Sequence, residues 1–154
     1  MVETSSLIPH PVTDDERLVH HKLDLLLRTG CILVENAADT SRIIRTMKRV
    51  AMYLCIPIEN LHIYVNYNML MVNLSDVEKS YTKFQRVDKH GVNLDAIREI
   101  SHLSWDSIRK NLTLEEYERQ LTEIHQRKRN YTPWQVAIGG GLACGGFCIQ
   151  FGCD

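Results

Sequence analysis

The sequence predicts an α+β domain with two helices, a three-stranded antiparallel meander and two further helices, followed by one glycine-rich transmembrane helix. Three observations indicate this fold class. Apolar residues recur with a helical period before residue 55 and after residue 93. Between these segments the period changes to the two-residue alternation of β-strands. Finally, no charged side chain occurs from Trp134 to Gly152, although charges are frequent in the preceding hundred residues.

Length and composition limit the classes of protein to consider. The 154 residues suffice for one domain of ordinary size plus the uncharged tail. Eighteen Lys and Arg residues nearly balance nineteen Asp and Glu residues, so nucleic acid is not an expected partner. The five cysteines form no CxxC or Cys/His cluster. They indicate reduced thiols rather than a disulfide framework, and neither a metal nor a cofactor is expected.

The first helix is predicted from its start and from its apolar face. Residues 1–12 contain two prolines and no long apolar run, which predicts a flexible N-terminal tail. Thr13 or Asp14 can then cap a helix whose apolar stripe runs from Leu23 to Val34. Gly30 falls within this stripe, and a glycine there predicts close packing against a neighbouring element.

The second helix is predicted to begin at Asp39 or Thr40, because their short oxygen acceptors suit an N-cap, and to end before Pro57. Its apolar side consists of Ile43, Met47, Val50, Ala51 and Leu54. Its polar side carries four cations, which are Arg42, Arg45, Lys48 and Arg49. Such a row is either a binding face or the solvated surface that many helices present.

The three strands follow from alternation and turn residues. Apolar and polar residues alternate over Leu61–Asn66, and a second apolar-rich run covers Met69–Leu74. We therefore expect a hairpin that turns at Tyr67 and Asn68. Ser80–Val87 is expected to form the third strand of the meander.

Two more helices are expected after the sheet. One covers Leu94–Lys110, and the other covers Leu114–Arg127 and begins with the capping box Thr113–Glu116. The inward face of the earlier helix is expected to contain Leu94, Ile97, Ile100 or Ser101, Ser104 and Ile108. The cytosolic domain is thus assigned to residues 13–130 and the membrane segment to residues 131–154.

The glycine-rich tail has two competing interpretations. A phosphate-binding loop requires a lysine and a hydroxyl residue after its last glycine, and neither is present here. A membrane helix requires about 20 mainly apolar residues, which Trp134–Gly152 nearly supplies. We therefore favour a first transmembrane helix, with a buried soluble helix or a disordered tail as the alternative.

Several features of the tail support membrane insertion. Arg127-Lys128-Arg129 marks the entry side as cytoplasmic, and Trp134 suits the interfacial aromatic belt. Gly141 and Gly145 form a small-xxx-small spacing, which favours close packing against other membrane helices.

Five segments, read in order, carry a resemblance to a known family. They are Asn36–Arg42, the hairpin Leu61–Leu74, Arg86 with His90–Leu94, the helix start Leu112–Glu116, and Tyr131-x-x-Trp134 before the glycine-rich run. In order and spacing they resemble the amino-terminal cytosolic domain and first span of the threonine/serine exporter family, in its shorter, two-component form. Asn36 and Asp39 depart from that pattern, in which a glycine and a glutamate are usual.

The resemblance implies a place and a function. It implies a bacterial inner (cytoplasmic) membrane protein whose N-terminal domain lies in the cytosol. The expected function is export of a small polar metabolite, either threonine or serine or a dicarboxylate such as succinate. The cytosolic domain would gate the bundle, gather substrate or dock a partner subunit. We also expect further membrane spans after Asp154 and a second membrane subunit, so that the chain represents a truncated transporter.

The resemblance also indicates where a small-molecule substrate would bind. The candidate substrate-binding residues are Asp39, Thr40, Arg42, Arg86 and Asn93. Guanidinium and amide groups suit a ligand that carries a carboxylate. The same residues equally suit structural hydrogen bonds around two turns, with Asp39 as a helix cap.

Two other functions compete with transport. A hydrolase-like enzyme domain would need a nucleophile with a positioned base, yet the sequence contains no GxSxG or HExxH motif and no paired carboxylates beside a histidine. We therefore expect no enzymatic activity. A soluble ligand-binding or regulatory module, with its tail folded as a buried helix, is the remaining alternative.

Overall fold

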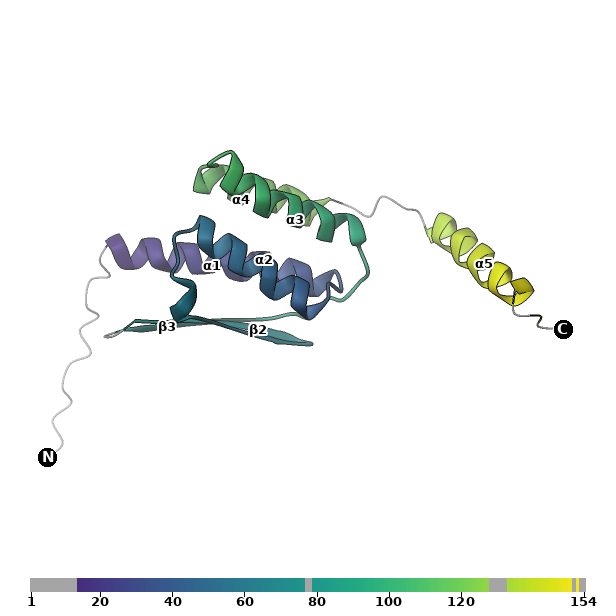
Figure 1. Ribbon diagram of the computed structural model, residues 1–154, viewed down its shortest axis with the longest axis horizontal. Coiled ribbons are helices and arrows are strands. Elements are labelled where there is room, and N and C mark those ends of the chain that lie inside the picture. Colours follow the sequence, from purple (N-terminus) through teal and green to yellow (C-terminus); the bar gives the residue numbers. More distant parts are fainter. Residues whose placement is uncertain (1–13, 77–78, 128–132, 151, 153–154) are drawn as a thin grey trace, which may run out of the picture.

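The computed structural model describes residues 14–76, 79–127, 133–150 and 152 (Figure 1). Its order of elements confirms the predicted α+β class, and the predicted tail of residues 1–12 lies outside the described residues. The elements are α1 (Asp14–Glu35), α2 (Thr40–Tyr53), the short 3-10 helix η1 (Ile58–Asn60), β1 (Leu61–Asn66), β2 (Met69–Ser75), β3 (Ser80–Arg86), α3 (Leu94–Arg109), α4 (Leu114–Gln126) and α5 (Pro133–Gln150).

The sheet is the predicted meander, with the strands in the order β1-β2-β3 and antiparallel throughout. Asn66 and Met69 are paired at the end of the hairpin, so the turn lies at Tyr67 and Asn68 as expected. The side-chain amide oxygen of Asn66 accepts a hydrogen bond from the backbone N–H of Tyr67 at 2.7 Å. Leu70 and Val72 of the central strand are fully buried, which fixes the face that packs on the helices.

The domain has three layers, which are visible in Figure 1. Helices α1 and α2 lie next to the sheet, and α3 and α4 lie on their other side. The predicted apolar stripe of α1 is buried, and so are Leu25, Ile32 and Leu33 outside that stripe. Because α1 contacts both the sheet and the outer helices, it is buried on two sides and forms the centre of the core.

Gly30 lies where α1 crosses α2 and β2, which confirms the close packing expected there. A Cβ atom at this position would lie 2.4 Å from Leu70 Cδ2 and 2.6 Å from Met47 Sδ. Both neighbouring side chains are fully buried. The missing side chain at Gly30 therefore allows three elements to meet in the core.

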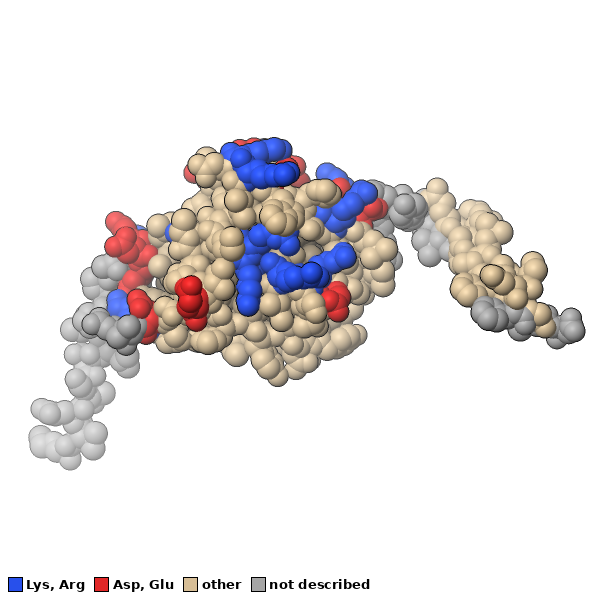
Figure 2. Space-filling model, in the orientation of Figure 1, with Lys and Arg blue, Asp and Glu red and all other residues tan. Residues whose placement is uncertain are grey.

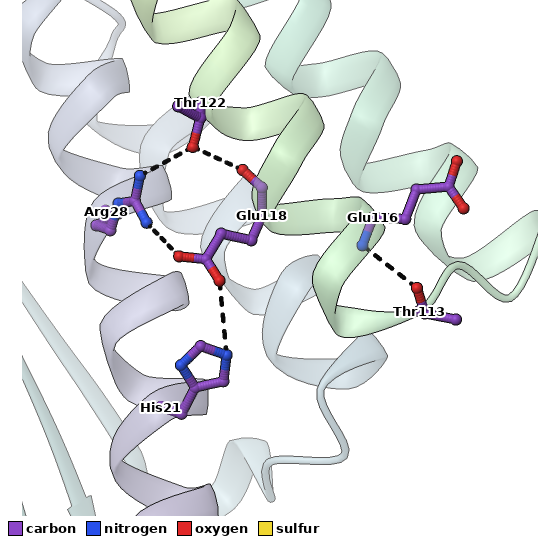
Figure 3. Close-up of polar contacts among 6 residues, drawn as sticks. All are labelled: His21, Arg28, Thr113, Glu116, Glu118 and Thr122. Atoms are coloured by element: carbon purple, nitrogen blue, oxygen red, sulfur yellow. Dashed lines mark hydrogen bonds and ion pairs between the residues drawn. The ribbon is translucent and has the colours of Figure 1, made fainter.

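Polar contacts attach α4 to α1 (Figure 3). The Arg28 guanidinium donates to Glu118 Oε1 at 2.8 Å and to Thr122 Oγ1 at 3.2 Å. Beneath them the Tyr117 hydroxyl lies 3.0 Å from Thr29 Oγ1 in the buried core. These contacts orient the outer helix on the central one.

The inward face of α3 differs in part from the prediction. Leu94 is 70% exposed and Ile108 is 40% exposed, whereas Leu103 and Ser107 are buried. The expected members Ile97, Ile100 and Ser104 are buried. The difference arises because α3 packs against both α2 and α4. Its buried surface is therefore wider than the single predicted stripe and is rotated about the helix axis relative to that stripe.

Helix α5 confirms the predicted helix at the glycine-rich tail, but the prediction that it spans a membrane is not confirmed. No helix within the described ranges combines the length and the apolar character that a crossing requires. The 18 residues of α5 rise about 27 Å, and its glycines together with Gln135 and Gln150 reduce its apolar character. Space is open around Gly141 and Gly145, so their predicted packing role is untested.

Candidate functional site

Two segments that carry the family resemblance lie side by side, although more than forty residues separate them. The first is the turn between α1 and α2, and the second is the loop that precedes α3. The backbone N–H of Gly91 donates to the carbonyl oxygen of Glu35 at 2.8 Å, and that of Asn93 donates to the carbonyl oxygen of Asn36 at 3.4 Å. The fold thus joins two segments whose proximity is not evident from the sequence.

The α1–α2 turn begins with an unusual helix end. Ala37 has a φ angle of 59°, in the left-handed region that glycine adopts more readily. Its N–H donates to the carbonyl oxygen of Val34, and the N–H of Ala38 donates to that of Leu33, both at 3.0 Å. This pair of bonds is a Schellman motif, which ends α1 and directs the chain into α2.

A cleft of about 650 Å³ lies beside these two segments and the tip of the β1–β2 hairpin. We call it the turn-loop cleft. Its apolar residues are Val34, Ile43 and Val65, and its polar side chains are Thr40, Asn66, Tyr67 and His90. The remaining lining residues are Ala37, Ala38, Gly91 and Val92. Its lining contains no Asp, Glu, Lys or Arg, so the cleft suits a small ligand without a large net charge.

The hairpin and the loop are joined at one end of the cleft by stacked rings. The centroids of Tyr67 and His90 are 4.3 Å apart, and their planes are inclined at 21°. The backbone N–H of Val87 also donates to the carbonyl oxygen of Asn68 at 2.8 Å. Both rings are nevertheless solvent-exposed, so they can contact a ligand that enters from outside.

The structure places three of the five candidate residues at the two turns. Thr40 lines the turn-loop cleft. Asp39 caps α2, since its Oδ2 accepts from the N–H of Ser41 at 3.0 Å and of Arg42 at 3.3 Å. Asn93 caps α3, because its Oδ1 accepts a hydrogen bond from the N–H of Ala96 at 3.2 Å. Structural hydrogen bonds around the two turns were one of the two alternatives expected for these residues.

The two candidate cations lie elsewhere. Arg42 lines a separate hollow between α2 and α3. Arg86 is at the end of β3, where its Nε lies 2.6 Å from Asp88 Oδ1. Neither residue belongs to the lining of the turn-loop cleft.

Three polar residues of the cleft were not singled out from the sequence. Asn66 and Tyr67 were assigned to the hairpin alone, because a turn between strands explains them without a ligand. His90 lies within a segment that carries the family resemblance, and this position was the one indication in the sequence that it could belong to a site. In the described part of the chain, no three His, Cys, Asp or Glu side chains are placed to hold a metal ion.

Comparison with known proteins provides the family. A family model described as "Putative threonine/serine exporter" (ThrE) matches residues 24–154. The chain belongs to the threonine/serine exporter family. The match includes both segments of the turn-loop cleft as well as α5, and it confirms the resemblance found in the sequence. No curated protein and no solved structure matches the chain.

Proposed function

We propose that this member of the threonine/serine exporter family takes part in export of threonine or serine, and that its α+β domain gathers the amino acid in the turn-loop cleft. The observation that carries the proposal is the composition of the cleft. Two segments with the family resemblance meet there around a small hollow with an apolar floor and an uncharged polar rim. Membership of a transporter family favours transport over the hydrolase-like alternative.

The chemistry of the rim fits a hydroxylated amino acid. Thr40, Asn66 and Tyr67 offer hydroxyl and amide groups that can donate to a carboxylate and accept from an ammonium group. The apolar side chains Val34 and Ile43 can contact the methyl group of threonine. A zwitterion has no net charge, so it needs no excess of cations in its site.

A dicarboxylate such as succinate fits the cleft less well. It carries two negative charges, and burial of these charges requires cationic partners. The cleft lining provides only His90 as a group that can become positive. Threonine and serine are therefore the substrates that the site favours.

The proposal for α5 is that it packs among other membrane helices of the exporter, in the bacterial inner membrane, with the α+β domain in the cytosol. Its large apolar side chains are exposed, with Leu142 at 74% and Ile149 at 85%. A Cβ atom at any of its five glycines would meet no neighbour within 4 Å. Further spans and a second membrane subunit would supply the partners for this surface.

Ligand binding can be tested by calorimetry on the full chain with L-threonine, L-serine and succinate. We expect heat of binding for the two amino acids at millimolar concentration and much less for succinate. His90→Ala should weaken threonine binding about tenfold, as expected for loss of about 1.4 kcal/mol. His62→Ala is the matched control, because His62 is also an exposed histidine but lies outside the cleft. Absence of binding, or equal loss in both variants, would contradict the assignment.

Membrane association needs a separate test, because a soluble ligand-binding module could give the same heats of binding in the calorimeter. After expression, the membrane fraction should retain the full chain until detergent is added. A chain that is monodisperse in the soluble fraction without detergent would refute the role of α5. That outcome would leave a regulatory module as the explanation of any ligand binding.

A further inference from the structure

A second hollow, on the face formed by α2 and α3, has the opposite electrostatic character. Its volume is about 300 Å³. Four arginines, a histidine and two hydroxyl residues line it, namely Arg42, Arg45, Thr46, Arg49, Arg98, Ser101 and His102. We call it the arginine hollow, and it shares no lining residue with the turn-loop cleft. Figure 2 shows blue Lys and Arg side chains gathered in the middle of one face of the domain.

The helical period explains why these groups converge. Arg42, Arg45 and Arg49 are spaced by three and four residues, so they occupy one side of α2 on successive turns. Arg98 and His102 are four residues apart on α3, which packs against α2. The row of cations noted in the sequence is therefore one wall of a hollow whose second wall is also basic.

Within the residues that the structure describes, only one of the four arginines is paired with a carboxylate. Arg98 pairs with Asp95 at 3.4 Å. Across the described part of the chain, no ion pair with an acidic side chain is found for Arg42, Arg45 or Arg49. Like charges at this spacing repel one another, so an anion bound between the arginines would relieve that repulsion.

One of the arginines is held in place by neutral groups. The Arg49 guanidinium donates to Ser104 Oγ at 2.9 Å and lies 4.2 Å from the centre of the Trp105 ring. Partial burial, and secondarily repulsion from Arg45, lowers the pKa of Arg49. These contacts orient a guanidinium before any ligand arrives, which reduces the ordering cost of binding.

We propose that the arginine hollow binds a phosphate group, carried either by a small soluble metabolite or by the headgroup of an anionic lipid. Guanidinium groups pair with phosphate through two parallel hydrogen bonds, and several of them can neutralise its two charges. The hollow is too small and the net charge of −1 too low for an extended polyanion such as nucleic acid. The site would thus allow a phosphorylated compound or the membrane surface to influence the exporter.

The test uses the full chain and measures thermal unfolding with added inorganic phosphate, pyrophosphate or succinate at constant ionic strength. We expect pyrophosphate to raise the midpoint by several degrees and to act at lower concentration than succinate. In parallel, the increase in flotation of the full chain when phosphatidic acid is added to phosphatidylcholine vesicles measures recognition of a lipid headgroup, separately from insertion of α5.

The informative variant is Arg45→Gln, because Arg45 is exposed and its replacement leaves the core intact. We expect Arg45→Gln to lower the affinity for pyrophosphate at least tenfold, or to abolish the effect of phosphatidic acid on flotation. Without ligand, the midpoint of thermal unfolding of the variant should be unchanged or higher. Arg109→Gln removes the same charge outside the hollow and is the control.

Pyrophosphate stabilisation that Arg45→Gln abolishes supports a soluble ligand. An increase in flotation with phosphatidic acid that Arg45→Gln abolishes supports a lipid headgroup. The proposal is overturned by a lack of response to every phosphate probe. It is also overturned by a response to succinate equal to that to pyrophosphate, or by equal responses in Arg45→Gln and the parent chain.

Discussion

The replacement of Gly30 by alanine is a sharp test of the central packing. Alanine normally stabilises the interior of a helix by about 1 kcal/mol relative to glycine. Here the new Cβ would lie 2.4 Å from Leu70 Cδ2 and 2.6 Å from Met47 Sδ, both closer than carbon or sulfur atoms can approach. The two neighbours come from β2 and α2 and are fully buried, so they cannot move outward into solvent.

The expected magnitude follows from these opposing effects. Overpacking in a well-packed core costs about 1–3 kcal/mol, and the two close contacts indicate the upper part of that range. After the helix-propensity gain, the free energy of unfolding should fall by about 1–2 kcal/mol. For a domain of this size, the loss corresponds to a decrease of the unfolding midpoint of about 4–8 °C.

The assay is urea unfolding of the full chain, followed by circular dichroism, with Met47→Ala as the partner in a double-mutant cycle. Met47→Ala removes one of the two obstructing side chains, so Gly30→Ala should be less damaging in that background, with a coupling of about 1 kcal/mol. An increase in stability for Gly30→Ala alone, or strict additivity in the cycle, would refute the proposed contact between α1 and α2.

Three further predictions test other parts of the structure. Ala37→Gly should raise the free energy of unfolding by about 1 kcal/mol in thermal or urea unfolding, because Ala37 has a left-handed backbone; a loss of stability would contradict this. Burial raises the pKa of Cys31 to about 12, so the folded state binds a proton that the unfolded state releases. Stability should therefore fall as the pH rises from about 9 to about 12, and it should fall less steeply in Cys31→Ala. Thiol reagents should modify the exposed Cys55 before the buried Cys31. Tyr117→Phe should cost about 1 kcal/mol in urea unfolding, since it removes the buried bond to Thr29; an unchanged midpoint would count against that bond.

Much of the fold follows from local patterns. Helix caps and turn residues predicted that α2 begins at Asp39 or Thr40 and that the hairpin turns at Tyr67 and Asn68, because these features depend on a few neighbouring residues. Burial was harder to predict where an element has two partners. The periodic stripe of α1 omitted Leu25 and Leu33, which are also buried. A single amphipathic face does not anticipate them, because α1 has neighbouring elements on both sides.

The candidate site shows the same limit. The residue types at Asp39 and Asn93 indicated two turns, and both residues act as helix caps. The sequence could not reveal that these turns are joined, since the link consists of backbone hydrogen bonds that leave no side-chain signal. The sequence also could not show that Arg42 and Arg86 lie away from the turn-loop cleft, so both were predicted to belong to one site with Asp39 and Asn93.

The most direct measurement of the central claim is the response of the histidine ring signals in NMR spectra of the full chain to L-threonine. The signal of His90, assigned by its loss in His90→Ala, should shift in a saturable manner with L-threonine and L-serine. His62 should not respond, because it lies outside the turn-loop cleft. Unchanged His90 signals at millimolar threonine, or equal shifts of both histidines, would contradict the assignment of this cleft as the substrate-gathering site.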